Sequence, residues 1–446
     1  MVESRRVDVL VAEIGSTTTV VSAFDGLADW PRSQPRLLGQ GVAATSVLQG
    51  DVGIGVEAAR AELEAAFGPL APGVTLATSS AAGGLRMTVH GLTQKMTAMA
   101  AREAALGAGG VVEYQTAGRL RDADLRRIDE ADPNLILLAG GVEGGDTETV
   151  LYNASRLIEL EARPIVVYGG NSAVADEACD TLVRAGFRVR ATRNVYPSVD
   201  ELDIVPARAV IHDAFEEHII HAPGMERIGE FVTGHILPTP GAVLIAAELL
   251  AEVEGDLVVI DVGGATTDVH SVTDGSPELA AIAIEPEPHS KRTVEGDLGT
   301  FVSARHVAAL ISEAERPDSL PPAVPFTPAE IESAALLARA AAVTAMTRHA
   351  GHLAHLYTPK GRQTVARGRD LTACRTVVGT GGALVRLPGG ESALSATLGG
   401  AGECLLPPAD ARVALDRDYV FACCGALSQH FESGAVVALM RASVGL

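Results

Sequence analysis

The sequence predicts an α/β protein that carries one hairpin twice. The first copy is "AEIGSTTTVV", Ala12 to Val21, and the second is "DVGGATTDVH", Asp261 to His270. With Glu13 set on Asp261, both read as an acid, a branched aliphatic residue, glycine, two small residues and two threonines. Apolar residues make up 47% of the 446-residue chain and aromatic residues only 4%, so the core must be built mainly from alanine, valine and leucine. The length favours two or three domains.

Each copy has the pattern of a strand, a turn and a returning strand. Val7 to Ala12 is almost wholly apolar, as in a strand buried on both faces, and Thr19 to Phe24 returns after the turn. In the second copy, Asp256 to Asp261 leads through "GGATT" into Asp268 to Val272. Because each hairpin opens an α/β half, we expect an internal duplication.

The middle of the chain alternates strands and helices. We expect strands at Leu135–Leu138, Pro164–Tyr168 and Phe187–Ala191, with helices at Glu148–Leu160 and Ala173–Ala185 between them. This βαβαβ order predicts a local parallel sheet.

Further elements complete the two halves. We expect helices at 53–67, 95–106, 207–221, 240–254, 301–312, 328–348 and 428–442, and strands at 74–78, 376–378 and 419–423. The Ala-rich helix at 328–348 starts at a proline and is expected to serve packing.

Charge and cysteine content narrow the class of protein. The formal charge of −21 argues against binding to nucleic acids or anionic membranes, which need a basic face. The five cysteines form no C-x-x-C pair and are expected to be reduced thiols. Without an apolar leader or a run long enough to span a bilayer, the chain is expected to be cytoplasmic.

Glycine and hydroxyl groups in a hairpin turn suit phosphate. Glycine lets the backbone N–H groups approach an anion closely, and threonine adds a hydroxyl donor. Two opposed hairpins would clamp the β- and γ-phosphates of one nucleotide between them. The residues expected to bind the nucleotide are Gly15, Ser16, Thr17 and Thr18 in the first turn and Gly263, Gly264, Thr266 and Thr267 in the second. The acids at their bases, Glu13, Asp261 and Asp268, are expected to hold hydrated Mg²⁺.

A third glycine turn belongs with the two hairpins. "VVGTGGALVR", Val377 to Arg386, is a buried strand that runs into a glycine-rich turn and a helix start. Gly379, Thr380, Gly381 and Gly382 are therefore expected to complete the ATP site.

The order of these three motifs resembles the actin, sugar kinase and heat-shock chaperone ATPase superfamily. "EIGSTTT" looks like its first phosphate motif, "DVGGATTD" its second and "GTGGAL" its adenosine motif. The resemblance implies a two-lobed α/β fold. The expected segments are a first lobe at 1–130, an inserted α/β subdomain at 131–205, connecting helices at 206–254, a second lobe at 255–420 and a C-terminal helix at 421–446 that returns to the first lobe.

Within this superfamily the sequence is similar to the MutL/GlmL family. "VAEIGSTTTVVSAF", "LILLAGGVEGGDTE", "KRTVEGDLG" and "RHAGHLAHLYTPKG" carry that similarity. The family implies an ATP-dependent chaperone or reactivating factor for an adenosylcobalamin-dependent mutase of the glutamate mutase type, with mutase subunits as partners. A homodimer is compatible with the sequence.

The resemblance also implies catalytic residues, with two departures. Asp261, Asp268 and Glu295 are the expected catalytic acids, with Asp297 as an alternative to Glu295. Glu13 stands where the superfamily usually has aspartate. Leu237 falls where the heat-shock chaperones have a water-positioning glutamate, so we expect weak ATPase activity at most.

Several alternatives stay open. A small-molecule kinase of the same fold would need a carboxylate base, for which Asp200, Asp203 and Asp213 are candidates. A nucleotide-gated scaffold without turnover would need none. The "AGGVEGGD" loop, 139–146, is either a tight connection capped by Asp146 or a ligand or partner contact. His349, His352 and His355 recur every third residue but lack the carboxylates of a metal site, so we expect surface or supporting roles.

Overall fold

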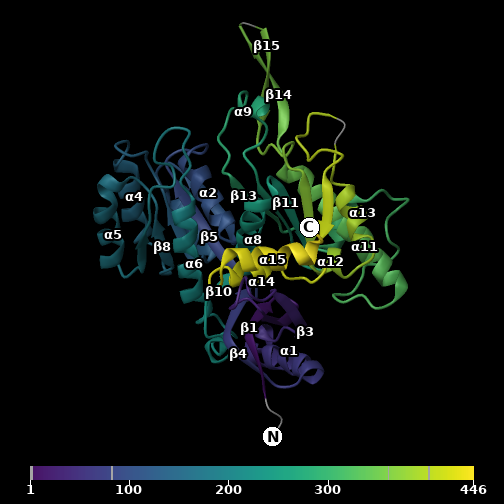
Figure 1. Cartoon of the computed structure of the whole chain (residues 1–446). Helices are drawn as coiled ribbons and strands as arrows, with labels where there is room; N and C mark the ends of the chain where they lie inside the picture. The colour runs from purple at the N-terminus through teal and green to yellow at the C-terminus, as the bar shows by residue number, and fades with distance from the viewer. Residues whose placement is uncertain (1–3, 82–83, 360, 400–401) are drawn as a thin grey trace. The chain divides into compact units, whose positions relative to one another are not determined.

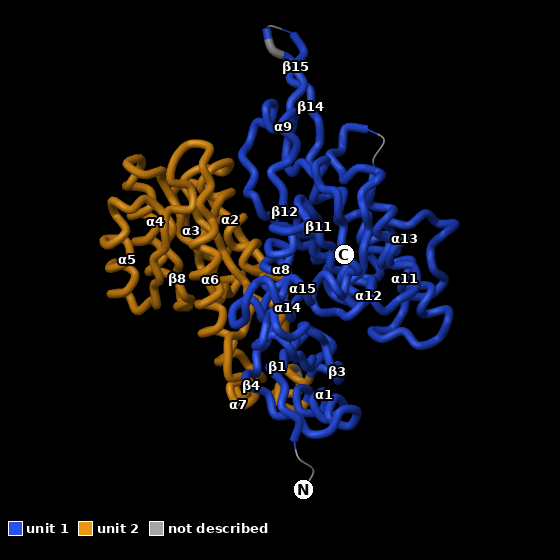
Figure 2. The backbone as a smooth tube through the Cα atoms, viewed as in Figure 1, with its two compact units in different colours: residues 1–45, 55–78, 242–446 blue, residues 46–54, 79–241 orange. Residues whose placement is uncertain are grey.

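The computed structural model describes residues 4–81, 84–359, 361–399 and 402–446. Helices and strands are mixed throughout, so the expected α/β class is confirmed (Figure 1). The chain forms two compact units, shown in different colours in Figure 2. Unit 1 comprises residues 1–45, 55–78 and 242–446, and unit 2 comprises residues 46–54 and 79–241.

The first sheet of unit 1 contains the N-terminal hairpin. Its strands lie in the order β4-β1-β2-β3. Their bounds are β1 (Arg5–Ile14), β2 (Thr18–Asp25), β3 (Arg36–Ala44) and β4 (Leu70–Ser79). Helix α1 (Val52–Phe67) packs closely on β3, because a Cβ added to Gly41 would lie 1.9 Å from the carbonyl oxygen of Ala59. Strand β3 was not expected from the sequence, since its pattern "RLLGQGVAA" has two glycines and no clear alternation.

The second sheet of unit 1 contains the other hairpin and the third glycine turn. Its strands lie in the order β13-β12-β11-β16-β17. Their bounds are β11 (Leu257–Val262), β12 (Thr267–Val272), β13 (Ser290–Glu295), β16 (Thr376–Thr380) and β17 (Arg412–Leu415). Strand β11 pairs antiparallel with β12 and parallel with β16, which brings the third turn beside the second hairpin.

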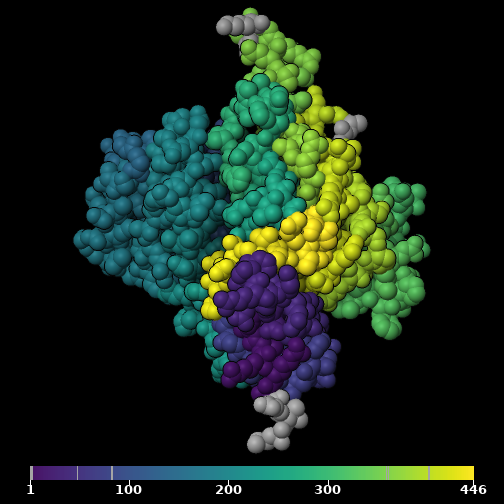
Figure 3. All heavy atoms as spheres, viewed as in Figure 1, coloured from purple at the N-terminus to yellow at the C-terminus, as the bar shows by residue number. Residues whose placement is uncertain are grey.

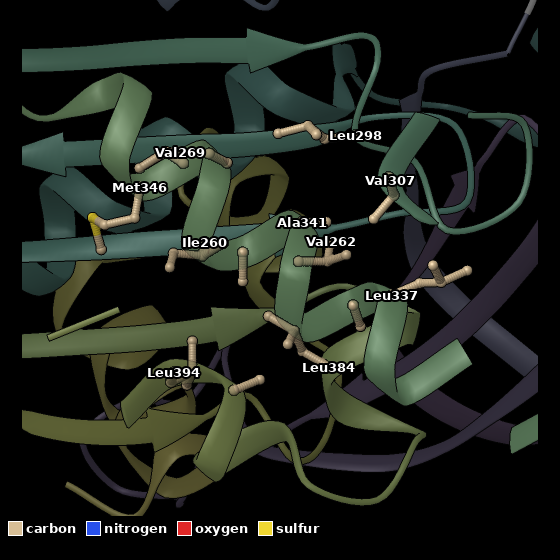
Figure 4. Packing of buried hydrophobic residues seen from close by; sticks show 14 of the residues in the cluster. Ile260, Val262, Val269, Leu298, Val307, Leu337, Ala341, Met346, Leu384 and Leu394 are labelled. Atoms are coloured by element: carbon tan, nitrogen blue, oxygen red, sulfur yellow. The ribbon is translucent and has the colours of Figure 1, made fainter. Parts of the chain in front are cut away.

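One face of this sheet packs on the Ala-rich helix α11 (Pro328–His349), which confirms its packing role. In Figure 4, Ile260 and Val262 lie beside Leu337 and Ala341 of the helix. Small alanines let the helix approach the sheet closely. Because strand side chains alternate between faces, Asp261 lies between Ile260 and Val262 but belongs to the opposite face.

The rest of unit 1 consists mainly of helices. The remaining elements of unit 1 are α8 (Thr239–Glu254, which begins in unit 2), α9 (Pro277–Ala280), α10 (Ala304–Leu310), β14 (His352–Thr358), β15 (Gly361–Arg367), α12 (Gly382–Val385), α13 (Gly390–Ser395), α14 (Phe421–Leu427) and α15 (Ser433–Val444). The strand expected at 419–423 was wrong, because residues 421–427 form helix α14. Asp416 accepts hydrogen bonds from the N–H groups of Val420 and Phe421 and so starts a helix that a short apolar run does not reveal.

Unit 2 is built around a parallel sheet in the order β6-β5-β7-β8-β9. Its elements are β5 (Leu85–Gly91), α2 (Thr97–Gly107), β6 (Gly110–Ala117), α3 (Asp122–Ala131), β7 (Leu135–Leu138), α4 (Glu148–Leu157), β8 (Ile165–Tyr168), α5 (Ala175–Arg184), β9 (Val189–Ala191), α6 (Val205–Ile219), α7 (Ile228–Phe231) and β10 (Ile236–Pro238), with short 3₁₀ turns at Val47–Gln49 and Ser172–Val174. The βαβαβ order expected from the sequence is present.

This sheet begins at β5, well before residue 131, where the sequence placed the start of the inserted subdomain. Strand β5 is buried although it contains polar residues, so its sequence does not show the apolar pattern of a buried strand. His90 is fully buried, and its ring nitrogens lie 3.0 Å from the Thr88 hydroxyl and 2.8 Å from the Thr116 hydroxyl. Burial lowers the pKa of His90 to about 3, so it is a neutral part of the core. No helix in the described parts of the chain is long and apolar enough to cross a membrane.

We predict that Gly425→Ala destabilises unit 1 by about 1–3 kcal/mol. A Cβ at Gly425 would lie 2.0 Å from the carbonyl oxygen of Ala242, so α14 would have to move away from α8. Urea unfolding followed by the fluorescence of Trp30, the single tryptophan, measures this change in unit 1. Gly229→Ala is the control, because no atom lies within 4 Å of its added Cβ. Equal stability of the two variants would contradict the packing argument.

Candidate functional site

The two hairpins match residue for residue in strand register. In the first, Glu13 pairs with Val20 and Ile14 with Thr19. In the second, Asp261 pairs with Asp268 and Val262 with Thr267. Each turn is closed by the same hydrogen bond, from Gly15 N to Thr18 O at 3.0 Å and from Gly263 N to Thr266 O at 2.9 Å. The repeated motif is therefore a repeated structure, with a second acid, Asp268, where the first hairpin has valine.

A threonine from another segment fixes each turn. The hydroxyl of Thr45 donates to Gly15 O at 2.8 Å in the first hairpin. In the second, Thr300 donates to Gly263 O from its backbone N–H at 3.1 Å and from its hydroxyl at 3.3 Å. The N–H groups of Phe301 and Val302 bind Gly264 O at 2.9 and 2.8 Å. Both turns are thus held from their carbonyl side in a fixed conformation.

The third glycine turn lies against the base of the second hairpin. Gly381 has φ +87°, and a Cβ added to it would lie 2.3 Å from Asp261 Oδ1. Glycine is required here for both conformation and space. At Gly382, the next residue, no atom lies within 4 Å of an added Cβ. The approach of backbone to carboxylate is therefore specific to Gly381.

The acids at the bases of the two hairpins meet in one small pocket. Glu13 and Asp261 line it together with Thr380 and Tyr419. Val243 of α8 and Phe421 and Ala422 of α14 complete its wall. The sequence argument that the two hairpins face each other is supported here by geometry.

Glu13 is buried, with 7% of its surface exposed, and accepts a hydrogen bond from the hydroxyl of Tyr419 at 2.8 Å. Burial raises the pKa of Glu13 to about 7, although this hydrogen bond opposes the rise. The side chain is therefore poised to gain or lose a proton near neutral pH.

Asp261 is partly buried and stands among other acids. Burial raises its pKa to about 8, and repulsion by Asp268 and Glu13 adds to the rise. The guanidinium of Arg292 opposes it. Such a pocket favours either a shared proton or a bound cation.

Asp268, the third acid expected to bind metal, is already paired. It is 5% exposed, and the buried guanidinium of Arg292 binds its Oδ1 through Nε at 2.7 Å and Nη2 at 2.6 Å. Its Oδ2 accepts from the Thr266 hydroxyl at 3.2 Å. In the described residues no group of three or more histidine, cysteine, aspartate or glutamate side chains is arranged to hold a metal ion. Two carboxylates, Glu13 and Asp261, line the pocket itself.

Glu295 ends β13, Asp297 follows two residues later, and both bind the guanidinium of Arg348. Arg348 donates from Nη1 to Glu295 Oε2 at 2.6 Å and to Asp297 Oδ1 at 2.7 Å. The hydrogen bond from Arg348 lowers the pKa of Asp297. Leu237, in unit 2, is buried in β10.

The expected ATP-binding residues differ in exposure. Ser16 and Thr17 are exposed at the first tip, whereas the Thr267 hydroxyl is buried and donates to Leu298 O at 2.6 Å. Gly379 is buried in β16, where an added Cβ would lie 2.8 Å from a methyl of Leu394. Thr267 and Gly379 therefore have structural roles, in hydrogen bonding and in close packing, that do not depend on a nucleotide.

Sequence reasoning missed two residues of the pocket region, Asp416 and Tyr419. Asp416 is fully buried and accepts hydrogen bonds from the hydroxyls of Ser443 at 2.7 Å and Thr380 at 2.9 Å. Tyr419 has φ +52°, a conformation rare for residues other than glycine, and this places its hydroxyl on Glu13. Only the acidic "DRDY" run before the last helices could have drawn attention to them.

The weaker signals also have structural outcomes. Asp146 accepts from Thr149 N at 3.0 Å and caps α4, and Glu143 of the same loop accepts from Asn194 Nδ2 at 2.8 Å. His349 ends α11 and is buried, while His352 and His355 lie on strand β14. The five cysteines are free thiols.

The fold and the site together define an α/β protein with a duplicated glycine–threonine hairpin around a pocket of carboxylates. The chain belongs to the MutL family: the family model described as "MutL protein" matches residues 9–444. "Protein MutL" from Clostridium tetanomorphum is 35% identical over 460 residues, covering 96% of this chain and 97% of that protein. The resemblance found in the sequence is confirmed.

Similar solved structures are more distant. A nucleotide-free acetone carboxylase has a TM-score of 0.38 and 11% identity, over 94% of this chain and 70% of that one. The ethanolamine utilization protein EutJ from Carboxydothermus hydrogenoformans has a TM-score of 0.26 and 11% identity, over 97% and 89%. A carbohydrate kinase from Novosphingobium aromaticivorans has a TM-score of 0.29 and 14% identity, over 95% of this chain and 92% of that one. These low scores carry no conclusion about function.

We predict that Asp261→Asn stabilises the nucleotide-free protein at alkaline pH. The folded carboxyl has a pKa of about 8, against about 4 in an unfolded chain. Between these values unfolding releases a proton, so the free energy of unfolding falls as the pH rises. Asparagine removes this loss, and the variant should be more stable than the unmodified protein by about 1–3 kcal/mol at pH 8, and by much less at pH 5.

Urea unfolding followed by Trp30 fluorescence at both pH values measures this difference. Asp297→Asn is the control with the opposite sign, because Arg348 lowers the pKa of Asp297 and stabilises its charged form. A destabilising effect of Asp261→Asn at pH 8 would show that its carboxylate is compensated in the folded protein.

Proposed function

We propose that the paired hairpins bind Mg-ATP and that the chain is an ATP-dependent reactivating factor for an adenosylcobalamin-dependent mutase. The observation that carries the nucleotide part is the meeting of Glu13 and Asp261, from matching positions of two hairpins, in one pocket. A pair of glycine–threonine turns above two acids suits a polyphosphate with its cation.

The roles of the turn residues follow from their positions. In this proposal, the first tip, with Ser16 and Thr17 exposed, contacts the terminal phosphates through N–H and hydroxyl groups. The second tip, at Gly264 and Thr266, contacts them from the other hairpin. Gly381 and Gly382 open the third turn, where α12 starts, to the adenosine.

Glu13 and Asp261 are the proposed holders of hydrated Mg²⁺. The residues fit this ion because burial, with repulsion from nearby acids, raises the pKa of both carboxyls, and a cation would offset the cost of their charged forms. When bound, Mg²⁺ would offset the charge of the phosphate oxygens. Asp268, held by Arg292, would orient the second turn through Thr266.

The proposed turnover is slow. A base that activates water works best with a pKa near the working pH. Glu295 is bound to Arg348, and the pKa of Asp297 is lowered, so neither is well suited as a free base. The chain has a leucine, Leu237, at the position expected for a water-positioning acid. This favours ATP as a slow switch over ATP as a fast substrate.

The proposed reactivating role rests on membership of the MutL family, because the family resemblance of this sequence implies a mutase as the partner. A ligand shifts a conformational equilibrium only by its different affinity for the two states. If ATP changes affinity for the mutase, the mutase must change affinity for ATP by the same factor. A kinase of this fold remains the competing hypothesis, and the measured products separate the two.

We predict that Gly381→Ala weakens Mg-ATP binding roughly tenfold or more. Its Cβ would collide with Asp261 Oδ1, and the positive φ adds strain. Gly229→Ala, whose added Cβ has no atom within 4 Å and lies outside the proposed site, is the control and should bind normally. Isothermal titration calorimetry with ATP and Mg²⁺ compares the two. Equal affinities would remove the third turn from the site, and no binding by the unmodified chain would remove the nucleotide proposal.

We predict that a mutase inactivated with hydroxocobalamin regains activity when this protein, Mg-ATP and fresh adenosylcobalamin are added together. Omitting ATP, or using Gly381→Ala, should prevent recovery, because the clamp then lacks its ligand. Phosphate release is measured in parallel. Transfer of phosphate to a small metabolite, with no recovery of the mutase, would replace this proposal by the kinase.

A further inference from the structure

Strands β14 and β15 form an arm, residues 352–367, whose charge differs from the rest of the chain. Its sequence "HLAHLYTPKGRQTVAR" contains two arginines, a lysine and two histidines but no aspartate or glutamate. The whole chain, by contrast, has 56 acidic residues against 35 lysines and arginines. The arm is thus an acid-free basic segment on an acidic protein.

The arm is a two-stranded sheet that extends from the body of unit 1 (Figures 1 and 3). Its strands pair from His352 with Arg367 to Thr358 with Gly361. At its base, isolated bridges join Ala366 to Ala283 and His352 to Cys404. Past these bridges no third strand joins the arm in the described part of the chain.

Exposed side chains of the arm are those that commonly make protein contacts. Tyr357, near the tip, is 83% exposed, and Arg362 and Arg367 are exposed on the opposite strand. Tyrosine and arginine are enriched where protein interfaces gain most of their free energy. Glu403 contacts the arm through the ring of His355, at 3.3 Å.

The base of the arm is fixed in the core. Arg369, 3% exposed, donates from Nε to the Ser271 hydroxyl at 2.8 Å and from Nη2 to His289 O at 2.6 Å. His349 lies 2.8 Å from both the Ser271 and the Thr293 hydroxyls. A free two-stranded ribbon is only marginally stable in water. This anchoring gives the arm a defined direction from strands β12 and β13.

We propose that the arm is the docking surface for a carboxylate-rich protein surface. This inference rests on the proposed function and assigns that surface to the mutase subunit. Charge complementarity carries it: an acidic partner is repelled by the body of this chain but attracted by the acid-free arm. A second copy of this chain, which is also acidic, is the alternative occupant, and the test below distinguishes it from the mutase subunit.

The test compares two double charge reversals. Arg362→Glu/Arg367→Glu changes the arm, and Arg32→Glu/Arg339→Glu makes the same change in charge at exposed residues elsewhere in unit 1. The probe is the cobalamin-dependent mutase subunit of the native cell, titrated into the full chain with Mg-ATP present. The arm variant should bind at least tenfold more weakly, and the control should bind as the unmodified chain does. Binding by the unmodified chain should also weaken as salt is added.

Further readouts keep the outcomes distinct. Tyr357→Ser leaves the charge unchanged and should also weaken mutase binding, while ATP affinity stays the same in every arm variant. If the unmodified chain binds the mutase and the arm variants bind equally well, the arm proposal is overturned and the proposed function stands. If the unmodified chain does not bind the mutase, both the arm proposal and the proposed function are overturned. Arm-dependent self-association in sedimentation velocity, without mutase binding, would assign the arm to a second copy.

Discussion

The placing of Glu13 and Asp261 in one pocket is the constraint on which the rest of unit 1 depends. Two carboxylates from distant parts of the chain are brought together where water is scarce, and both hold protons more tightly as a result. A protein designed only for stability would place apolar residues there, since buried acids oppose folding. The proposed Mg²⁺ would offset part of this cost by neutralising the charge of the two carboxylates.

Residues around the pocket reduce the free-energy cost of burying Glu13 and Asp261, but they do not remove it. Arg292 binds Asp268, which lies directly opposite Asp261, and its positive charge opposes the rise that Asp268 causes in the pKa of Asp261. Asp416 is surrounded by hydroxyl and backbone donors and starts helix α14. Tyr419 accepts an uncommon backbone conformation so that its hydroxyl can reach Glu13. Strain and buried charge thus gather in the same few residues, as is common at functional sites.

The sequence predicted the structure well where a motif is repeated, and poorly where the structure depends on contacts between residues far apart in the chain. The two hairpins could be predicted to within about two residues at each strand end, because glycine, threonine and an acid recur at the same spacing and the turn depends on local geometry. The buried strands β11 and β16 and the long helix α11 followed from their apolar patterns. Strand β5 was missed, because His90 and Thr88 make it look polar although they satisfy each other inside the core.

The parts of the site that could not be predicted are those set by tertiary contacts. Nothing in "DRDY" indicates that Asp416 will cap a helix or that Tyr419 will contact Glu13. Similarly, both Asp261 and Asp268 were expected from the sequence to bind metal. Asp268 is instead bound by Arg292, which lies on the neighbouring strand β13. The helix at 421–427 was taken for a strand because its N-terminal cap lies five residues before it.

The hydrogen bond from Tyr419 to Glu13 has a consequence for how the chain is made. Its two residues are 406 positions apart, so the first hairpin leaves the ribosome long before its partner exists. At a translation rate of roughly 5–20 residues per second, the wait is roughly 20–80 seconds. The pocket can close over Glu13 only after the segment around Tyr419 has been made, so its completion is a late step in the folding of unit 1.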